Sequence, residues 1–120
     1  MSVLLVAIAT ILVPASPAAA ETYEVKMGAD SGQLRFVPND LTISPGDTVN
    51  FVMNKLAPHN VVFDKTPGGI SADSLSAKNL MFAPGETATV SFPGDAPTGE
   101  YSFYCTPHRG AGMNGKITVQ

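Results

Sequence analysis

Short stretches in which apolar and polar residues alternate make up most of the chain after residue 20. Residues 22–27 alternate and end at Gly28, and further short runs follow at 41–43, 60–63, 80–82, 100–105 and 115–119. An alternation with a period of two is typical of a β-strand with one buried face. Residues 64–79 are polar and rich in Gly, Ser and Ala, which predicts a loop with at most one helical turn, at residues 71–76.

Two segments, residues 44–51 and 83–90, share a Pro-Gly-acid opening followed by a strand pattern. Proline and then glycine at the central positions predict a type II turn. In the strand after each turn, alternate residues share a face: Val49, Phe51 and Met53 in the first, and Ala88, Val90 and Phe92 in the second. About eight such strands joined by turns predict an all-β fold, an eight-stranded antiparallel Greek-key β-sandwich or barrel.

The first twenty residues have a different pattern from the rest. An apolar run from Val3 to Val13 is followed by the small residues Ala18-Ala19-Ala20. This pattern predicts a secretory signal peptide at 1–20, cleaved before Glu21, and leaves 21–120 as one domain. The apolar run is shorter than the ~20 residues that a membrane-spanning helix needs. The formal charge of −3, without a basic stripe, argues against nucleic acid as a partner.

Cys105 is the only cysteine, which is unusual for a chain predicted to be exported. Either its thiol is a small buried hydrophobic group or its sulfur is protected and used. Because side chains alternate across a strand, Cys105 shares a face with Tyr101 and Phe103, while Tyr104 points the other way. If the Phe103 face is the core, the sulfur points inward beside an outward-facing tyrosine.

The residues around Cys105 are candidate metal ligands. His108 follows three positions later and Met113 five positions after that, and His59 is the only other histidine. Each alone has an ordinary explanation, as a surface histidine or a core methionine. Two imidazoles, one thiolate and one thioether together make the ligand set of a blue-copper site. The pattern therefore predicts one copper ion bound by His59, Cys105, His108 and Met113.

Residues 56–64 and 101–113 resemble the plastocyanins, especially those of cyanobacteria, and the similarity extends over essentially all of residues 21–120. The resemblance implies that the same four residues bind copper as Cu(II) or Cu(I). It also implies that Asn60 braces the ligand loop, through its backbone to the sulfur and through its side chain towards Thr106. Pro107 stiffens the first half of that loop.

The resemblance further implies a soluble, monomeric electron carrier, not an enzyme, in the thylakoid lumen. It would take electrons from cytochrome f and give them to photosystem I, docking transiently at these membrane complexes. His108 would reach the surface through an apolar end formed by Gly28, Leu34, Pro58, Pro107, Gly110 and Ala111. Arg109 could steer an acidic partner, and Tyr104 would be an electron path or a docking residue.

The acidic clusters of the plant proteins are largely absent, because only Asp64 and Asp73 lie in the central stretch. We therefore expect a modest salt dependence of the reaction with partners. Four alternatives remain at this point. They are an electron donor of the pseudoazurin type in a periplasm, a copper-delivery module, a copper enzyme, which would need an open coordination position, and a metal-free adhesion-type sandwich.

Overall fold

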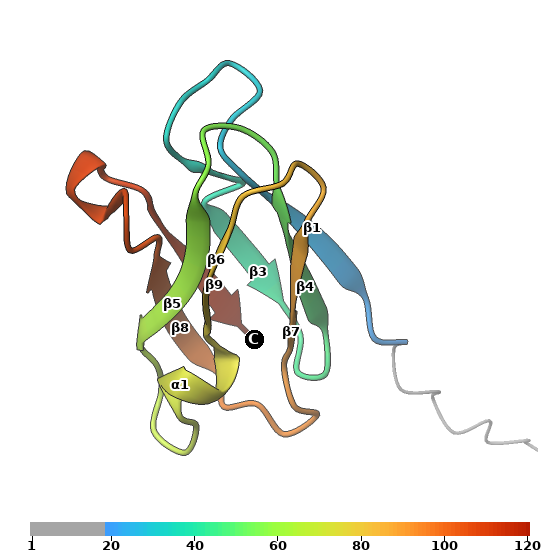
Figure 1. Cartoon of the computed structure of the whole chain (residues 1–120). Helices are drawn as coiled ribbons and strands as arrows, with labels where there is room; N and C mark the ends of the chain where they lie inside the picture. Colours follow the sequence, from blue (N-terminus) through green and yellow to red (C-terminus); the bar gives the residue numbers. More distant parts are fainter. Residues whose placement is uncertain (1–18) are drawn as a thin grey trace, which may run out of the picture.

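The chain folds into a sandwich of two β-sheets (Figure 1). The computed structural model describes residues 19–120. The first sheet has the strand order β2-β1-β4-β7, formed by Phe36–Val37, Thr22–Met27, Thr48–Met53 and Thr87–Ser91. The second has the order β3-β9-β8-β5-β6, formed by Asp40–Ile43, Asn114–Val119, Gly99–Tyr104, His59–Lys65 and Ala77–Met81. Nearly all of the predicted signal peptide lies outside the described residues, so its cleavage stays a prediction.

The predicted β-sandwich is confirmed, with two differences in detail. Residues 19–120 form nine strands, because the two residues of β2 pair with the end of β1. The sheets are mixed, because β1 pairs with β4 and β3 pairs with β9 in parallel. Such pairs join strands that are distant in the sequence, which a local pattern of alternation does not report.

The core between the sheets is built from the residues that the alternation placed on one face. Val49, Phe51 and Met53 of β4 are all buried. The Phe51 ring packs edge-on against Phe36 and Phe103, with centroids 6.0 and 5.3 Å away. Edge-to-face contacts at these separations are favourable beyond the area that they bury. The core therefore fixes β8, the strand that leads to Cys105.

Both predicted Pro-Gly turns are present. Gly46 and Gly85 have φ values of 88° and 87°, and the residue after each glycine donates a backbone hydrogen bond across the turn. The predicted helical turn is α1, Ala72–Leu75. Strand β6 begins earlier than predicted and ends at Met81, because Phe82 lies beyond the ladder and is 62% exposed.

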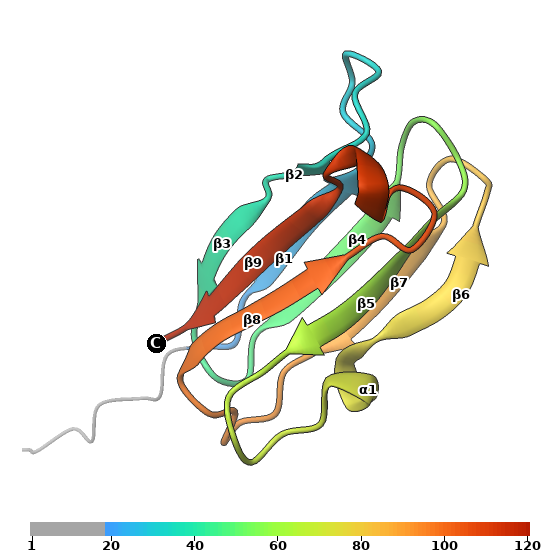
Figure 2. The ribbon, with the colours of Figure 1, turned by 90° about the vertical axis from the view of Figure 1, so that its left-hand side faces the viewer.

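The loop that carries three of the four candidate ligands and the loop that precedes His59 lie together at one end of the sandwich. Strand β8 ends at Tyr104 and β9 begins at Asn114, so the loop of residues 105–113 joins two paired neighbours. The β4–β5 loop, residues 54–58, reaches the same end (Figure 2). Among residues 19–120, no helix is long and apolar enough to cross a membrane.

Candidate metal centre

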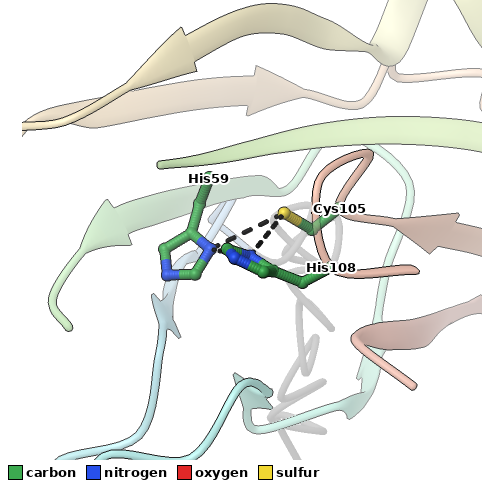
Figure 3. Close-up of side chains that lie close together, drawn as sticks. All are labelled: His59, Cys105 and His108. Atoms are coloured by element: carbon green, nitrogen blue, oxygen red, sulfur yellow. Dashed lines mark hydrogen bonds between the residues drawn. The ribbon is translucent and has the colours of Figure 1, made fainter. Parts of the chain in front are cut away.

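Three side chains converge at this end of the sandwich: His59, Cys105 and His108 (Figure 3). The Cys105 sulfur lies 3.6 Å from Nδ1 of His59 and 3.7 Å from Nδ1 of His108. The two Nδ1 atoms are 3.2 Å apart. The ligand-type atoms of the three residues all lie within 4.8 Å of one another. Sequence reasoning predicted this cluster, although His59 is separated from Cys105 by 46 positions.

His59 is the first residue of β5 and is fully buried. Its Nε2 is hydrogen bonded to the backbone carbonyl of Lys55. A carbonyl can only accept, so Nε2 carries the proton and Nδ1 presents its lone pair towards Cys105. Burial lowers the pKa of His59, the nearby His108 lowers it further, and the Lys55 carbonyl opposes both by raising it. The ring is therefore held neutral, in the tautomer that a metal needs.

The Lys55 carbonyl is itself held in place. The Lys55 N–H donates to the Met27 carbonyl at 3.2 Å. The adjacent Gly28 has a φ of 88°, and a Cβ there would lie 2.1 Å from the Lys55 oxygen. Only glycine allows this approach without displacing the backbone. Gly28 therefore supports His59 through Lys55, an acceptor that sequence reasoning missed because a backbone carbonyl has no sequence signature.

Cys105 follows β8 and points inward, as the alternation predicted, and its thiol is fully buried. Burial raises the pKa of Cys105, whereas the backbone N–H groups of Asn60 and His108 lower it. Burial is the larger effect, so the pKa of Cys105 lies above its ordinary value, and a bound cation would be needed to favour the thiolate, which is the form that binds a metal.

The loop that carries the other two candidates is closed by its own backbone. The Cys105 N–H donates to the Met113 carbonyl at 3.1 Å, and the Met113 N–H donates to the His108 carbonyl at 3.2 Å. Between them, η1 (Arg109–Ala111) makes one tight turn that ends at Gly112, which has a φ of 88°. Met113 is buried, whereas His108 is only half-buried. This folding places a histidine at the surface and a thioether inside.

Asn60 ties the β5 side of the cluster to the ligand loop. Its Oδ1 accepts the Thr106 N–H at 2.7 Å, and its Nδ2 donates to the Thr106 hydroxyl at 3.1 Å. A third bond, from Nδ2 to the Lys78 carbonyl, anchors the side chain to β6. The bracing role expected of Asn60 would act on Thr106 through these contacts. Pro107 is exposed beside them.

Two imidazole nitrogens and one cysteine sulfur lie close together, with a buried methionine on the same loop, and these donors fit copper. This donor set combines the imidazole and sulfur ligands of blue-copper sites. The family model "Copper binding proteins, plastocyanin/azurin family" matches residues 23–120. The chain belongs to the plastocyanin/azurin family. It is a copper-binding protein, and its cofactor is one copper ion.

Two cyanobacterial relatives and one solved structure show the similarity in detail. The chain is 59% identical to a plastocyanin of a Synechococcus species over 106 residues, which cover 87% of this chain and 77% of that protein. It is 57% identical to plastocyanin of Nostoc punctiforme over 107 residues, covering 86% and 77%. The oxidised plastocyanin of the fern Dryopteris crassirhizoma superposes with a TM-score of 0.66 at 32% identity, covering 81% of this chain and 99% of that one.

In this member of the plastocyanin/azurin family, the residues predicted around His108 come from the loops at the same end of the sandwich. Pro107, Gly110 and Ala111 are exposed, and Leu34 and Pro58 are half-buried. Gly28 is buried, so it shapes this end without offering surface. Leu56 was not predicted here, although it is 46% exposed and apolar. In the sequence, only its position two residues before Pro58 indicated that Leu56 lies at this end of the sandwich.

Tyr104 and Arg109 contact each other on the side of the sandwich. The Arg109 guanidinium carbon lies 3.8 Å above the centre of the Tyr104 ring, a cation–π geometry. Arg109 also pairs with the Asp64 carboxylate at 3.2 Å. The pairing with Asp64 was not foreseen, because 45 positions separate the two residues. Arg109 is therefore held by two neighbours of its own chain.

Proposed function

We propose that this blue-copper electron carrier binds its metal through His59, Cys105, His108 and Met113, and that it takes single electrons from cytochrome f to photosystem I. The observation that carries the proposal is the convergence of two Nδ1 atoms and the Cys105 sulfur at the half-buried end of the sandwich. Copper supplies the Cu(II)/Cu(I) couple there. The four ligand side chains leave the metal no position for a substrate, so we propose a carrier and not an enzyme.

The held geometry of the ligand side chains supports electron transfer. His59 is fixed by the Lys55 carbonyl, and the loop of Cys105 is fixed by Asn60. Buried groups that are already oriented need little rearrangement when the charge at the site changes. The protein therefore contributes a stiff frame around the metal, which favours rapid exchange of one electron.

The end of the sandwich around His108 supports transient docking. His108 is half-buried, and the exposed Pro107, Gly110 and Ala111 lie next to it in the sequence. The exposed Leu56 extends the apolar surface on the β4–β5 loop. Brief redox encounters use small interfaces, which dissociate quickly after the electron has moved. We propose that partners approach His108 across this surface.

Tyr104 offers a second contact to partners. It is covalently joined to Cys105, and a cleft of about 530 Å³ lies between it and Pro107. Arg109 is 57% exposed and lies over the Tyr104 ring, so an acidic partner group would meet both. The Asp64 pairing offsets part of the Arg109 charge, which favours the modest salt dependence expected from the sequence.

We propose that the protein works in the thylakoid lumen as a soluble monomer, with residues 1–20 as the cleaved signal peptide and 21–120 as the copper domain. An electron donor in a periplasm, of the pseudoazurin type, remains the second candidate, because it would have the same site and other partners. A copper-delivery module is less well supported, because its metal would be cargo on exchangeable ligands, whereas His59, Cys105 and Met113 are buried.

One experiment separates these functions. The copper-loaded protein is reduced and mixed with photosystem I particles, and its reoxidation is followed after a light flash. We expect rapid reoxidation, and in a second assay rapid reduction by cytochrome f. The Ala111→Glu variant places a charge on the docking surface and should slow both reactions without changing the copper spectrum. Absence of reaction with both partners would favour the periplasmic electron donor.

A further inference from the structure

Asp47 carries a buried carboxylate far from the metal centre. Its side chain is 4% exposed, and it lies in the turn between β3 and β4. Oδ2 accepts the Ser44 N–H at 2.9 Å, and Oδ1 accepts the backbone N–H of Glu21, also at 2.9 Å. Burying a carboxylate is costly unless a positive charge or several donors compensate it. Two neutral donors are all that these contacts supply.

Within the part of the chain that the structure describes, neither Asp47 nor Glu21 forms an ion pair with a Lys or Arg side chain. Every Lys or Arg ion pair between residues 19 and 120 involves an acid other than Asp47 or Glu21. The titratable groups here are Asp47, the Glu21 carboxylate and the Tyr23 hydroxyl, which donates to Glu21 at 3.0 Å. That bond, burial, and the charges of Glu21 and Asp47 all raise the pKa of Tyr23. The two carboxylates therefore have no cationic ion-pair partner among residues 19–120.

The donor to Asp47 Oδ1 is the backbone nitrogen of Glu21, which would become the N-terminal amine if the chain were cleaved before Glu21. Glu21 follows Ala18-Ala19-Ala20, and residues 19–21 are exposed, so a protease can reach this bond. Glu21 is also anchored through its carbonyl, which accepts the Thr48 N–H at 2.9 Å. The backbone N–H and carbonyl of Glu21 are thus hydrogen bonded to Asp47 and Thr48, at the start of β4.

We propose that Asp47 is a receptor for the processed N-terminus: cleavage before Glu21 converts a hydrogen bond from a neutral amide N–H into an ion pair between the new α-ammonium group and the buried Asp47 carboxylate. Hydrolysis breaks the Ala20–Glu21 peptide bond, adds the hydroxyl of water to the Ala20 carbonyl carbon, and leaves the Glu21 nitrogen as an amine that takes up a proton. The ion pair adds the Coulombic attraction of the ammonium group to the hydrogen bond that the amide N–H already makes with the carboxylate. Cleavage before Glu21 therefore stabilises the copper domain, in addition to separating it from residues 1–20.

The ion pair predicts a defined dependence on pH. An α-amino group ordinarily has a pKa of about 7.7–8.0, and a carboxylate partner raises it in the folded state. The stabilisation is then fully present below the ordinary pKa and is lost as the pH rises through the higher folded value. A rise of about one unit corresponds to a tenfold tighter hold on the proton.

The test uses the full chain expressed in a host that exports and processes it. The exported protein is loaded with copper, its mass is measured, and its α-amino group is titrated by the rate of labelling with an amine reagent. We expect the mass of residues 21–120 and a pKa raised by about one unit. The Asp47→Asn variant should return the pKa to its ordinary value. The matched Asp95→Asn variant, at an exposed acid in the loop after β7, should not.

A second measurement keeps the proposal testable if Asp47→Asn fails to fold. Selective acetylation of the N-terminus of the processed protein should lower its stability to denaturant at pH 7, and the difference should vanish above about pH 10. A mature chain that begins elsewhere, an ordinary pKa in the unaltered protein, or an acetylated protein of unchanged stability would each overturn the proposal. All of these results are independent of electron transfer.

Discussion

Asn60 and Thr106 are joined by two hydrogen bonds, one to the backbone N–H of Thr106 and one to its hydroxyl. The pair links β5, which carries His59, to the loop that carries Cys105 and His108. One buried side chain thus connects the two parts of the chain that provide the candidate ligands.

Replacing Asn60 with Ala should loosen this connection. Both bonds to Thr106 and the bond to the Lys78 carbonyl are lost, and we expect the free energy of unfolding to fall by about 1–3 kcal/mol. Denaturant unfolding of the copper-free protein measures the loss. Thr106→Val is the control, because it removes the hydroxyl bond alone and should cost about 1 kcal/mol or less. Equal losses in the two variants would contradict a bracing role for the Thr106 N–H bond.

Gly28→Ala should damage the metal centre from a distance. The added Cβ would lie 2.1 Å from the Lys55 oxygen, the atom that holds His59. The backbone must then shift, and we expect weaker copper binding as well as lower stability. Gly32→Ala is the matched control, because Gly32 also has a positive φ, of 83°, but nothing lies within 4 Å of the added group. It should cost about 1–2 kcal/mol of stability and leave copper affinity unchanged.

If copper affinity fell equally in the two glycine variants, general strain and not displacement of Lys55 would explain the loss. Copper titration with a competing chelator provides that comparison. The absorption spectrum at saturating copper then reports whether His59 has moved.

The copper-free protein should lose stability as the pH falls. Burial, together with the charge of His108, lowers the pKa of His59 in the folded state. The unfolded chain therefore binds more protons as the pH falls through about 6.5, the ordinary histidine value, and stability declines over that range. Thermal unfolding between pH 7.5 and pH 5 measures the decline. A stability that stayed constant or rose towards pH 5 would contradict a buried neutral His59.

Asp64→Asn should free Arg109 for partners. Asp64 is its ion-pair partner within the chain, whereas the Tyr104 ring remains beneath it in the variant. We expect faster reaction with an acidic partner at low ionic strength, by up to about tenfold, and a steeper dependence on salt. Arg109→Gln should slow the same reaction. Stopped-flow kinetics over a range of salt concentrations compares the variants, and identical salt slopes for all three proteins would show that Arg109 does not steer the encounter.

The features predicted from the sequence are those determined locally. The inward direction of Cys105 and the outward direction of Tyr104 follow from the strand period, and the turn at Gly46 follows from its Pro-Gly pair. Pairing over long distances has no such signature. The parallel pairs of β1 with β4 and of β3 with β9 were therefore missed.

The candidate site likewise has residues that the sequence predicts and contacts that it does not. His59 was predicted because the chain holds only two histidines and one cysteine, so a complete donor set left little choice. The Lys55 carbonyl that orients its ring is a backbone atom, and any residue type could provide it. The sequence places Asp64 only among a few scattered acids, because its contact with Arg109 depends on how β5 and the ligand loop meet.

The most direct test of the metal centre is the addition of one equivalent of Cu(II) to the copper-free protein and to its Cys105→Ser variant. The unaltered protein should turn intensely blue, from the bond between copper and the Cys105 sulfur, and should bleach with a mild reductant. The variant should keep its fold, measured by circular dichroism, and develop no blue colour. An unaltered protein that stayed colourless, or a variant with the same blue spectrum, would contradict the account.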